Sequence, residues 1–328
     1  MLFGRGVHAE FDFQDKVVVV TGALSSVGRQ LAHRLVALGC LVSLIDSQAD
    51  GSGEALSAEL CEFSKALGTP ETCNGLSDMP VVRCVYIRSD LRQPQDIRLM
   101  IEATILAFGR MDVLVNNAHT VADDDDASAP CGVNEVVDLI DINLRAPVVA
   151  TWVFAEYLRQ SSDGRRGVVV SVAAVAGLVP GRGREIFGAA SAGLIHFTQA
   201  SSSREKTDGL RVCALAPYYV EAGGGGRLLP GSRHVGGALT LSSAQVVDAV
   251  LRCIRDERLS GRTVLVAGGS MYRHSWAVLV VARLHVFLIM LWSMLVLAFR
   301  RVLGAGRAVE PVAAVDAPAL LAEKKKAQ

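Results

Sequence analysis

The sequence predicts an α/β fold, a doubly wound parallel sheet of about seven strands, followed by a C-terminal hydrophobic membrane helix. Three observations favour this architecture. Short, apolar, β-branched runs alternate with stretches of helical spacing along residues 15–270. A glycine-rich turn, TGALSSVG, separates the first apolar run from the first helical stretch. Residues 276–299 form an almost entirely apolar run beyond the last of these strands.

The first half of the sheet is predicted from four apolar runs. The run KVVVV at 16–20 is typical of a strand buried on both faces. Further strands are expected at 41–45, 81–87 and 111–115. Between them the apolar spacing predicts helices, at 29–38, 54–67 and 96–108. Residues 68–80, rich in Gly, Pro, Ser and Thr, are expected to form a loop.

The second half continues the alternation. Strands are expected at 167–172, 210–215 and 262–267, and helices at 135–160, 187–203 and 244–256. Strands that alternate with helices imply right-handed crossovers and a parallel sheet covered on both faces. Residues 1–14 are expected to be an N-terminal extension of this domain.

Composition excludes some classes of function. The 33 basic and 33 acidic residues balance, so there is no electrostatic case for nucleic acid as a partner. The chain has seven cysteines, and no two of them have CxxC spacing. We therefore expect reduced thiols and no metal site.

The turn at 21–28 predicts a dinucleotide site. Its glycines let the backbone approach a pyrophosphate, and the following helix offers free N–H groups. Asp46 ends the second predicted strand, where a carboxylate accepts the ribose hydroxyls and repels a 2′-phosphate. Asp90 ends the third, within reach of an adenine edge, and Asn117 ends the fourth. These positions meet at one edge of a parallel sheet.

Together these features resemble the short-chain dehydrogenase/reductase family. TGALSSVG is similar to the family's TGxxxGxG, and NNAH at 116–119 to its NNAG. Asn143, in DINLRAP, matches the family's active-site asparagine. ALAP at 214–217 and GRTVLVAGG at 261–269 match its closing strands. The resemblance covers about residues 15–269 and implies a Rossmann fold with a nicotinamide cofactor.

The resemblance also implies the cofactor contacts. The residues expected to bind the dinucleotide are Thr21, Gly22, Ser26, Val27, Gly28, Asp46, Asp90, Leu91, Asn117, Ala118 and Pro217. Asp46 favours NAD(H) over NADP(H). On the nicotinamide side, Ser26 replaces a glycine, Tyr218 replaces a glycine and Ala222 replaces a threonine. We therefore expect weakened binding on that side.

The family's catalytic Ser, Tyr and Lys are missing. Their positions hold Ala174, Phe187 and Ser191, and only Asn143 of the active-site set remains. None of the five tyrosines is followed by a lysine four residues later. Ser171, Tyr218 or Tyr219 are conceivable substitutes.

The sequence leaves two hypotheses about function. In the first, the chain binds NAD(H) but is catalytically impaired, and it acts as a binding, sensing or scaffold protein. In the second, it is an active NAD-dependent oxidoreductase that acts on a lipophilic molecule through non-standard residues. The substrate would be a lipid, a steroid, a retinoid or a long-chain alcohol or ketone.

The apolar run at 276–299 predicts membrane attachment. As a helix it would extend ~36 Å, against a hydrocarbon core of ~30 Å, and it could span the bilayer or re-enter it. Arg300, Arg301 and Arg307 favour a cytoplasmic side for the residues after this run. Residues 300–328 are expected to be a flexible, basic, Ala-rich tail. Its last residues, KKAQ, resemble a retrieval signal for the endoplasmic reticulum.

The remaining expectations concern placement and assembly. A nucleotide domain without a signal peptide is expected to face the cytoplasm. The two long predicted helices, 135–160 and 187–203, would mediate a homo-oligomer.

Overall fold

The computed structural model describes residues 11–68, 82–121, 132–161, 164–179, 184–220, 240–267 and 270–273. The chain divides into two units, Met1–His274 and Ser275–Gln328. The expected membrane helix at 276–299 and the expected tail at 300–328 lie outside the described residues, as does most of the N-terminal extension. Among the helices that are described, none has the length and apolar character needed to cross a bilayer.

The parallel sheet is confirmed. Its strands in chain order are β1 (Val17–Thr21), β2 (Leu41–Asp46), β3 (Cys84–Arg88), β4 (Val113–Asn116), β5 (Gly167–Val172), β6 (Leu210–Pro217), β9 (Thr263–Ala267) and β10 (Ser270–Arg273). Their spatial order is β10-β9-β6-β5-β4-β1-β2-β3. All neighbouring strands run parallel except β10, which pairs antiparallel with β9. Seven strands ending with β9 were predicted, and the edge strand β10 was not.

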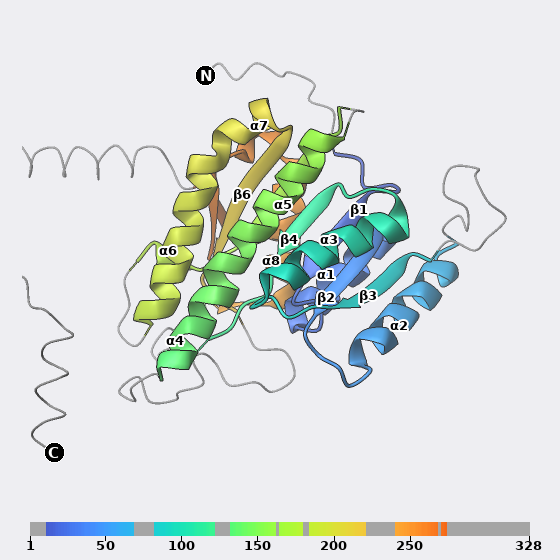
Figure 1. Ribbon diagram of the computed structural model, residues 1–328, viewed down its shortest axis with the longest axis horizontal. Helices are drawn as coiled ribbons and strands as arrows, with labels where there is room; N and C mark the ends of the chain where they lie inside the picture. Colours follow the sequence, from blue (N-terminus) through green and yellow to red (C-terminus); the bar gives the residue numbers. More distant parts are fainter. Residues whose placement is uncertain are drawn as a thin grey trace, which may run out of the picture. The chain divides into compact units, whose positions relative to one another are not determined.

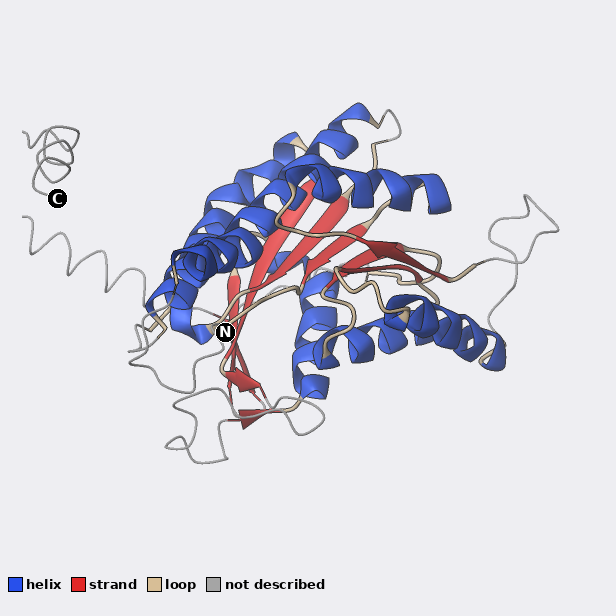
Figure 2. Cartoon of the chain, turned by 60° about the horizontal axis from the view of Figure 1, so that its bottom comes forward, coloured by secondary structure: helices blue, strands red, loops and turns tan. Residues whose placement is uncertain are grey.

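Helices cover both faces of this sheet (Figures 1 and 2). They are α1 (Ser26–Ala37), α2 (Ser52–Ala66), α3 (Pro94–Phe108), α4 (Val133–Ile140), α5 (Ala146–Gln160), α6 (Glu185–Ala200), α7 (Arg204–Thr207) and α8 (Ser243–Arg255). Helix α1 contacts α2 and α8 on one face, and α5 contacts α3 and α6 on the other. A short separate strand pair, β7 (Tyr219–Val220) and β8 (Thr240–Leu241), lies apart from the main sheet.

Several predicted boundaries are wrong for local reasons. Helix α1 begins at Ser26 rather than at 29, because the Ser25 hydroxyl caps it by accepting the Gly28 N–H. Strand β3 begins at Cys84 rather than at 81. The single helix expected at 135–160 is α4 and α5 joined by a π-helical turn, Asp141–Arg145. The residues on either side of that turn, Ile140 and Ala146, have helical backbone angles, so the chain remains helical from α4 into α5.

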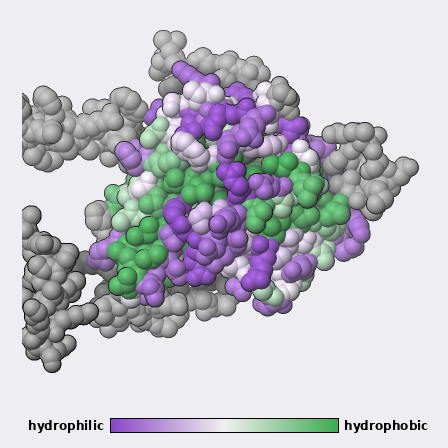
Figure 3. All heavy atoms as spheres, in the orientation of Figure 1, coloured by the Kyte–Doolittle hydropathy of each residue, from purple (hydrophilic) through white to green (hydrophobic). Residues whose placement is uncertain are grey.

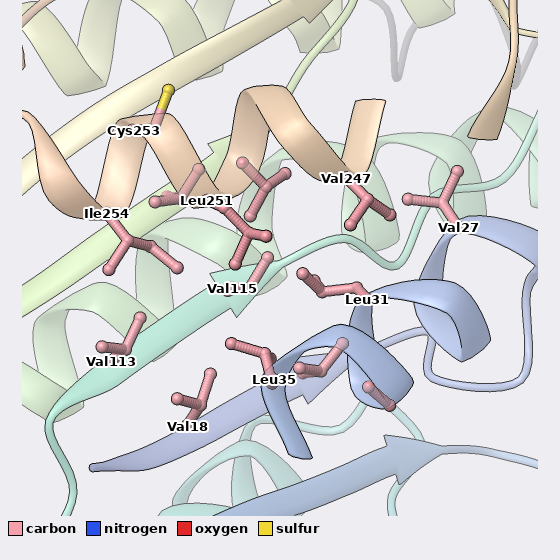
Figure 4. Packing of buried hydrophobic residues seen from close by; sticks show 14 of the residues in the cluster. Val18, Val27, Leu31, Leu35, Val113, Val115, Val247, Leu251, Cys253 and Ile254 are labelled. Carbon is pink, nitrogen blue, oxygen red and sulfur yellow. The ribbon is translucent and has the colours of Figure 1, made fainter. Parts of the chain in front are cut away.

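The core is built on the apolar strands. Every residue of β1 is buried, which is why its run is apolar without alternation. On one face, Leu31 and Leu35 of α1 meet Leu251 and Ile254 of α8 above β1 and β4 (Figure 4). Each such fully buried leucine or isoleucine contributes about 1.5–3 kcal/mol.

The strand order places a crevice at the carboxyl ends of β1 and β4. From β1 the chain proceeds to β2 on one side, whereas β4 leads to β5 on the other. Connections that leave two neighbouring strands in opposite directions open a gap between them, where α/β folds bind ligands. The turn after β1 and the residues after β4 both lie at this gap.

Candidate functional site

The turn after β1 is compact because of its two outer glycines. Gly22 has a φ of +64°, which side-chain-bearing residues rarely adopt. A Cβ on Gly28 would lie 2.2 Å from the Gly22 carbonyl oxygen. Between them, the Ser25 hydroxyl donates to Gly22 O at 2.8 Å and accepts the Gly28 N–H at 3.1 Å. The turn therefore delivers the backbone directly into the start of α1.

Thr21 and Asn117 join β1 to β4 beneath this turn. The N–H groups of Asn117 and Ala118 both donate to Thr21 Oγ1 at 3.0 Å. Asn117 Nδ2 donates to the carbonyl oxygens of Thr21 and Gly22, at 3.0 and 3.1 Å. Asn117 Oδ1 is buried and accepts no hydrogen bond from the described residues. An acceptor is thus left at the floor of the crevice.

A pocket of about 220 Å³ occupies the side of the crevice where adenosine is expected. It brings together six of the predicted cofactor-binding residues: Gly22, Asp46, Asp90, Leu91, Asn117 and Ala118. Asp46 Oδ2 accepts the Leu24 N–H at 3.0 Å, and its Oδ1 accepts the Ser47 N–H at 2.9 Å. The carboxylate of Asp46 is thereby held at the wall of this pocket.

Arg92 is a pocket residue that the sequence analysis missed. Its guanidinium bonds both oxygens of Asp90, with Nη2 to Oδ2 at 2.9 Å and Nε to Oδ1 at 3.0 Å. It also reaches Asp138 Oδ2 on α4 at 3.1 Å. The hydrogen bonds from Arg92 lower the pKa of the Asp90 carboxyl below its ordinary value. The one signal in the sequence is a basic residue directly after the strand-end pair Asp90-Leu91.

A second pocket, of about 240 Å³, continues the crevice toward β5 and α6. Predicted residues in its wall are Ser26, Val27, Asn143 and Pro217, together with the three substituted positions Ala174, Phe187 and Ser191. The other residues of the wall are mostly apolar, with Arg184 as the one charged side chain among the residues described there: Ser25, Asn117, His119, Val121, Val172, Ala173, Val175, Ala176, Arg184, Tyr218, Val220 and Val246. The sequence positions aligned with the family's catalytic residues therefore do meet in one place.

Asn143 is held by the loop after β4. Its Oδ1 accepts the Thr120 N–H at 2.9 Å, and its Nδ2 donates to Thr120 O at 2.7 Å. The backbone of Thr120 therefore satisfies both the oxygen and the nitrogen of the Asn143 amide. Asn143 lies in the π-helical turn between α4 and α5, and such turns are frequent at functional sites.

His119 in the wall was not predicted, and neither was the contact that the predicted residue Ser26 makes with α8. His119 lines both pockets, and its Nδ1 lies 3.0 Å from Asn117 O, so this nitrogen donates its proton. Ser26 Oγ lies 3.1 Å from Ser243 Oγ and links α1 to α8. Histidine in place of the glycine of NNAG was a visible signal, whereas the pairing of Ser26 with Ser243 depends on the fold.

Ser171 and Tyr218, two of the residues considered as catalytic substitutes, lie in different places relative to the second pocket. Ser171 is buried, accepts from Asn116 Nδ2 at 3.2 Å and is not part of the pocket wall. Tyr218 does line the second pocket. The side chain of Tyr219 and the whole of Ala222 lie outside the described residues.

Comparison with known proteins identifies the family of this chain. The family described as short chain dehydrogenase matches residues 16–228. The chain is 25% identical over 210 residues to 15-hydroxyprostaglandin dehydrogenase (NAD+) of Homo sapiens, covering 62% of this chain and 68% of that protein. It is 25% identical over 205 residues to 3-oxoacyl-(acyl-carrier-protein) reductase of Synechocystis sp., covering 62% and 74%.

Solved structures show the same fold. A short chain dehydrogenase from Burkholderia cenocepacia J2315 in complex with NADP has a TM-score of 0.64 at 23% identity, covering 79% of this chain and 99% of that one. A short chain dehydrogenase from Mycobacterium avium has a TM-score of 0.63 at 22% identity, covering 80% and 85%.

Proposed function

Because this chain belongs to the short-chain dehydrogenase/reductase family, we propose that it binds a nicotinamide dinucleotide but has lost the family's proton transfer. It then serves as a binding, sensing or scaffold protein. The observation that carries this proposal is the contrast between the two pockets. One keeps its cofactor residues, whereas the other has Ala174, Phe187 and Ser191 at the catalytic positions.

The binding half of the proposal rests on the glycine cradle. A side chain on Gly22 or Gly28 would collide with the backbone of Ala118 or of Gly22, so only glycines allow this tight turn, and α1 begins within it, at Ser26. Helix N-termini favour phosphate groups through their free N–H groups and their dipole. A bound nicotinamide ring would supply hydride transfer.

Asp46 supports NAD(H) over NADP(H). Its carboxylate is fixed by the N–H groups of Leu24 and Ser47 at the pocket wall. A carboxylate there accepts hydrogen bonds from ribose hydroxyls and repels a 2′-phosphate. A relative whose name includes NAD+ is in keeping with this preference.

The loss of proton transfer follows from side-chain chemistry. Phe187 has no exchangeable proton, and Ala174 has no hydrogen-bonding group. Ser191, one helical turn after Phe187, is buried and carries no positive charge. A missing general acid costs ~10²–10⁴ in rate. Ser26 and Tyr218 in the same wall also weaken binding on the nicotinamide side.

The apolar wall of the second pocket favours a lipophilic small molecule as the other ligand. Val172, Val175, Phe187 and Val246 all face this pocket, and apolar linings bind apolar ligands by removing their surface from water. Relatives named for prostaglandin and steroid substrates are in keeping with this class.

His119 supports the alternative function, an active oxidoreductase on a lipid, steroid, retinoid or long-chain alcohol or ketone. With Nδ1 donating to Asn117 O, its Nε2 is the nitrogen that accepts a proton. His119 lines both pockets, so this base would stand between cofactor and substrate. The Tyr218 hydroxyl is a second group in this wall that can exchange a proton with a substrate.

Titration of the full-length chain with NADH, followed by fluorescence, separates these functions. Lipid alcohols and NAD+, or ketones and NADH, are then supplied. We expect binding of NADH, weaker binding of NADPH and no turnover. Turnover that His119→Gln removes would establish the alternative and overturn the first function. Absence of NADH binding would overturn both.

We further propose that residues 276–299 attach the chain to a membrane. Support comes from the length and the apolar character of this run. The measurement is alkaline extraction of membranes from cells that express the full chain or a chain ending at residue 274. We expect only the full chain to stay with the membranes. Release of both into the supernatant would contradict attachment.

Exposed apolar side chains on α4 and α5 support a homo-oligomer. Val133, Val137 and Ile140 of α4 are 80%, 49% and 40% exposed, and Trp152 of α5 is 52% exposed. Figure 3 shows hydrophobic groups among hydrophilic ones on the face that carries these helices. Light scattering of the full chain in detergent should show an oligomer that Val133→Asp with Val137→Asp dissociates. A monomer at all concentrations would exclude it.

A further inference from the structure

Helix α2 lies close to the edge strand β3 along a face of small residues. Gly53, Ser57 and Cys61 recur at every fourth position, and all three meet β3. A Cβ on Gly53 would lie 2.3 Å from the Tyr86 ring. Ser57 Oγ donates to Cys84 O at 2.9 Å, and Cys61 Sγ lies 3.7 Å from the same oxygen. This close approach brings the two thiols of Cys61 and Cys84 together.

The two thiols have different surroundings. Cys84 is 1% exposed within the core, whereas Cys61 is half-buried at its rim. The hydrogen bond from the Cys84 side chain, followed by those of the backbone, lowers the pKa of the Cys61 thiol to about 6 against the effect of burial. The same contact, together with burial, raises the pKa of Cys84. Because Cys61 is accessible and its pKa is lowered, whereas Cys84 lies behind it in the core, Cys61 is the thiol that a dissolved oxidant meets first.

We propose that Cys61 and Cys84 form a peroxide-reactive pair that closes to a disulfide between α2 and β3. The Cys61 thiolate attacks one oxygen of hydrogen peroxide, the O–O bond breaks, and the departing hydroxide takes a proton to become water. Cys61 is then a sulfenic acid. The Cys84 sulfur attacks the Cys61 sulfur, the S–O bond breaks, and water leaves with the Cys84 proton. Two thiols are oxidised to one disulfide, and the peroxide is reduced to two waters.

The pair is connected to the adenosine-side pocket through Tyr86, two residues after Cys84. The Tyr86 hydroxyl donates to the carbonyl oxygens of Asp46, at 3.2 Å, and Gln48, at 2.6 Å. A disulfide beside it would fix α2 and β3 at the rim of the pocket that holds Asp46. The thiol reaction itself stands without the proposed function, whereas any effect of it on nucleotide affinity rests on that function.

A second cysteine pair serves as a matched control. Cys213 of β6 and Cys253 of α8 also contact each other, but both are fully buried. An oxidant in water cannot reach them while the chain is folded. The two pairs thus share their contact and differ in access.

The test is a peptide map of the reduced full-length chain after brief exposure to hydrogen peroxide. Remaining thiols are blocked with iodoacetamide, and digestion with trypsin and a glutamate-specific protease places Cys61, Cys73 and Cys84 in separate peptides. We expect peptide 60–62 linked to peptide 84–88, with Cys213 and Cys253 alkylated only after unfolding. A Cys61 that stays reduced, or that links to Cys73 instead, would overturn the proposal.

Two variants test which cysteine reacts with peroxide and which one then forms the disulfide. In Cys84→Ser, Cys61 should remain as a sulfenic acid that dimedone traps, because the resolving thiol is gone. In Cys61→Ser, Cys84 should resist peroxide as Cys213 does. In the unmodified chain, alkylation of Cys61 at pH 7 should be at least ~10-fold faster than that of Cys84, because only the thiolate reacts. Equal rates for the two would contradict the assignment of Cys61 as the nucleophile.

Discussion

The two pockets of the crevice have similar volumes, about 220 and 240 Å³, but different linings. Charged side chains line the first, whereas mostly apolar side chains line the second. The two pockets share Ser25, Asn117 and His119. The first is built from the turn after β1 and from strand ends, so its features follow from backbone geometry. The second depends on single side chains after β5 and on α6. Substitution of those side chains leaves strands and helices intact, so binding and chemistry can be lost separately in this fold.

The largest change we expect is a gain of activity in the second pocket. Phe187→Tyr, Ser191→Lys and Ala174→Ser together restore a proton donor, a positive charge one helical turn away and a hydrogen-bonding hydroxyl. We expect NADH-dependent reduction of a lipophilic ketone to rise by ~10²–10⁴-fold, the usual contribution of general acid catalysis. The assay follows NADH absorbance.

The control for this gain is Phe187→Leu, which keeps the pocket apolar and should stay inactive. NADH binding by the triple variant shows that it is folded. A triple variant that binds NADH and gains nothing would mean that the second pocket has lost more than these three groups.

Removal of the Asp46 carboxylate should weaken the first pocket. In Asp46→Ser the ribose loses a charged acceptor, so NADH affinity should fall by ~10–100-fold. The preference for NADH over NADPH should narrow as well. Fluorescence titration with both nucleotides measures this. Asp50→Asn is the control, because Asp50 is exposed and bonds only the nearby Ser52 N–H among the contacts described. An unchanged NADH affinity in Asp46→Ser would exclude the assigned role.

The turn between β1 and α1 has no space for even one methyl group on Gly28. In Gly28→Ala the new Cβ meets the Gly22 carbonyl oxygen at 2.2 Å, so the turn must shift. We expect the free energy of unfolding to fall by about 1–3 kcal/mol, with a further loss of NADH affinity. Thermal unfolding of the full chain reports the first effect. Gly132→Ala, where no atom lies within 4 Å of the added Cβ, should change stability little.

The smallest effect concerns the ion pair at the edge of the first pocket. Because Arg92 lowers the pKa of Asp90, the pair stabilises the fold above the ordinary aspartate pKa. This stabilisation is lost as pH falls through the lowered value. Both side chains are partly exposed, so Arg92→Gln should cost under about 1 kcal/mol at pH 7. The melting temperatures of the two proteins should converge as the pH falls below the lowered pKa of Asp90. A gap that widens on acidification would contradict this.

The sequence predicted the features that local patterns determine. The apolar runs located seven parallel strands, and the glycine spacing located the turn between β1 and α1. Asp46, Asp90 and Asn117 were placed correctly at one sheet edge, because the carboxyl ends of parallel strands share that edge.

The features that the sequence did not predict depend on contacts between distant elements. Ser26 meets Ser243 only because α1 packs against α8, and Cys61 meets Cys84 only because a glycine and a serine let α2 approach β3. The π-helical turn at Asp141–Arg145 lies within continuous helical backbone and contains neither glycine nor proline, so the sequence predicted one unbroken helix. Strand β10 was missed because its short run, Ser270–Arg273, comes after a strand that already closes the predicted sheet.

The π-helical turn at Asp141–Arg145 also has an evolutionary consequence. A wider turn of this kind holds one residue more than an α-helical turn, which is the trace that a single-residue insertion leaves in a helix. Deleting that residue would close the turn to an α-helical one and keep the residues beyond it, Phe154 among them, in the same rotational register. The side chains within the turn would be the ones that move, so the Asn143 amide would lose its hydrogen bonds to Thr120. The extra residue is therefore tied to the position of Asn143 and not to the packing of α5.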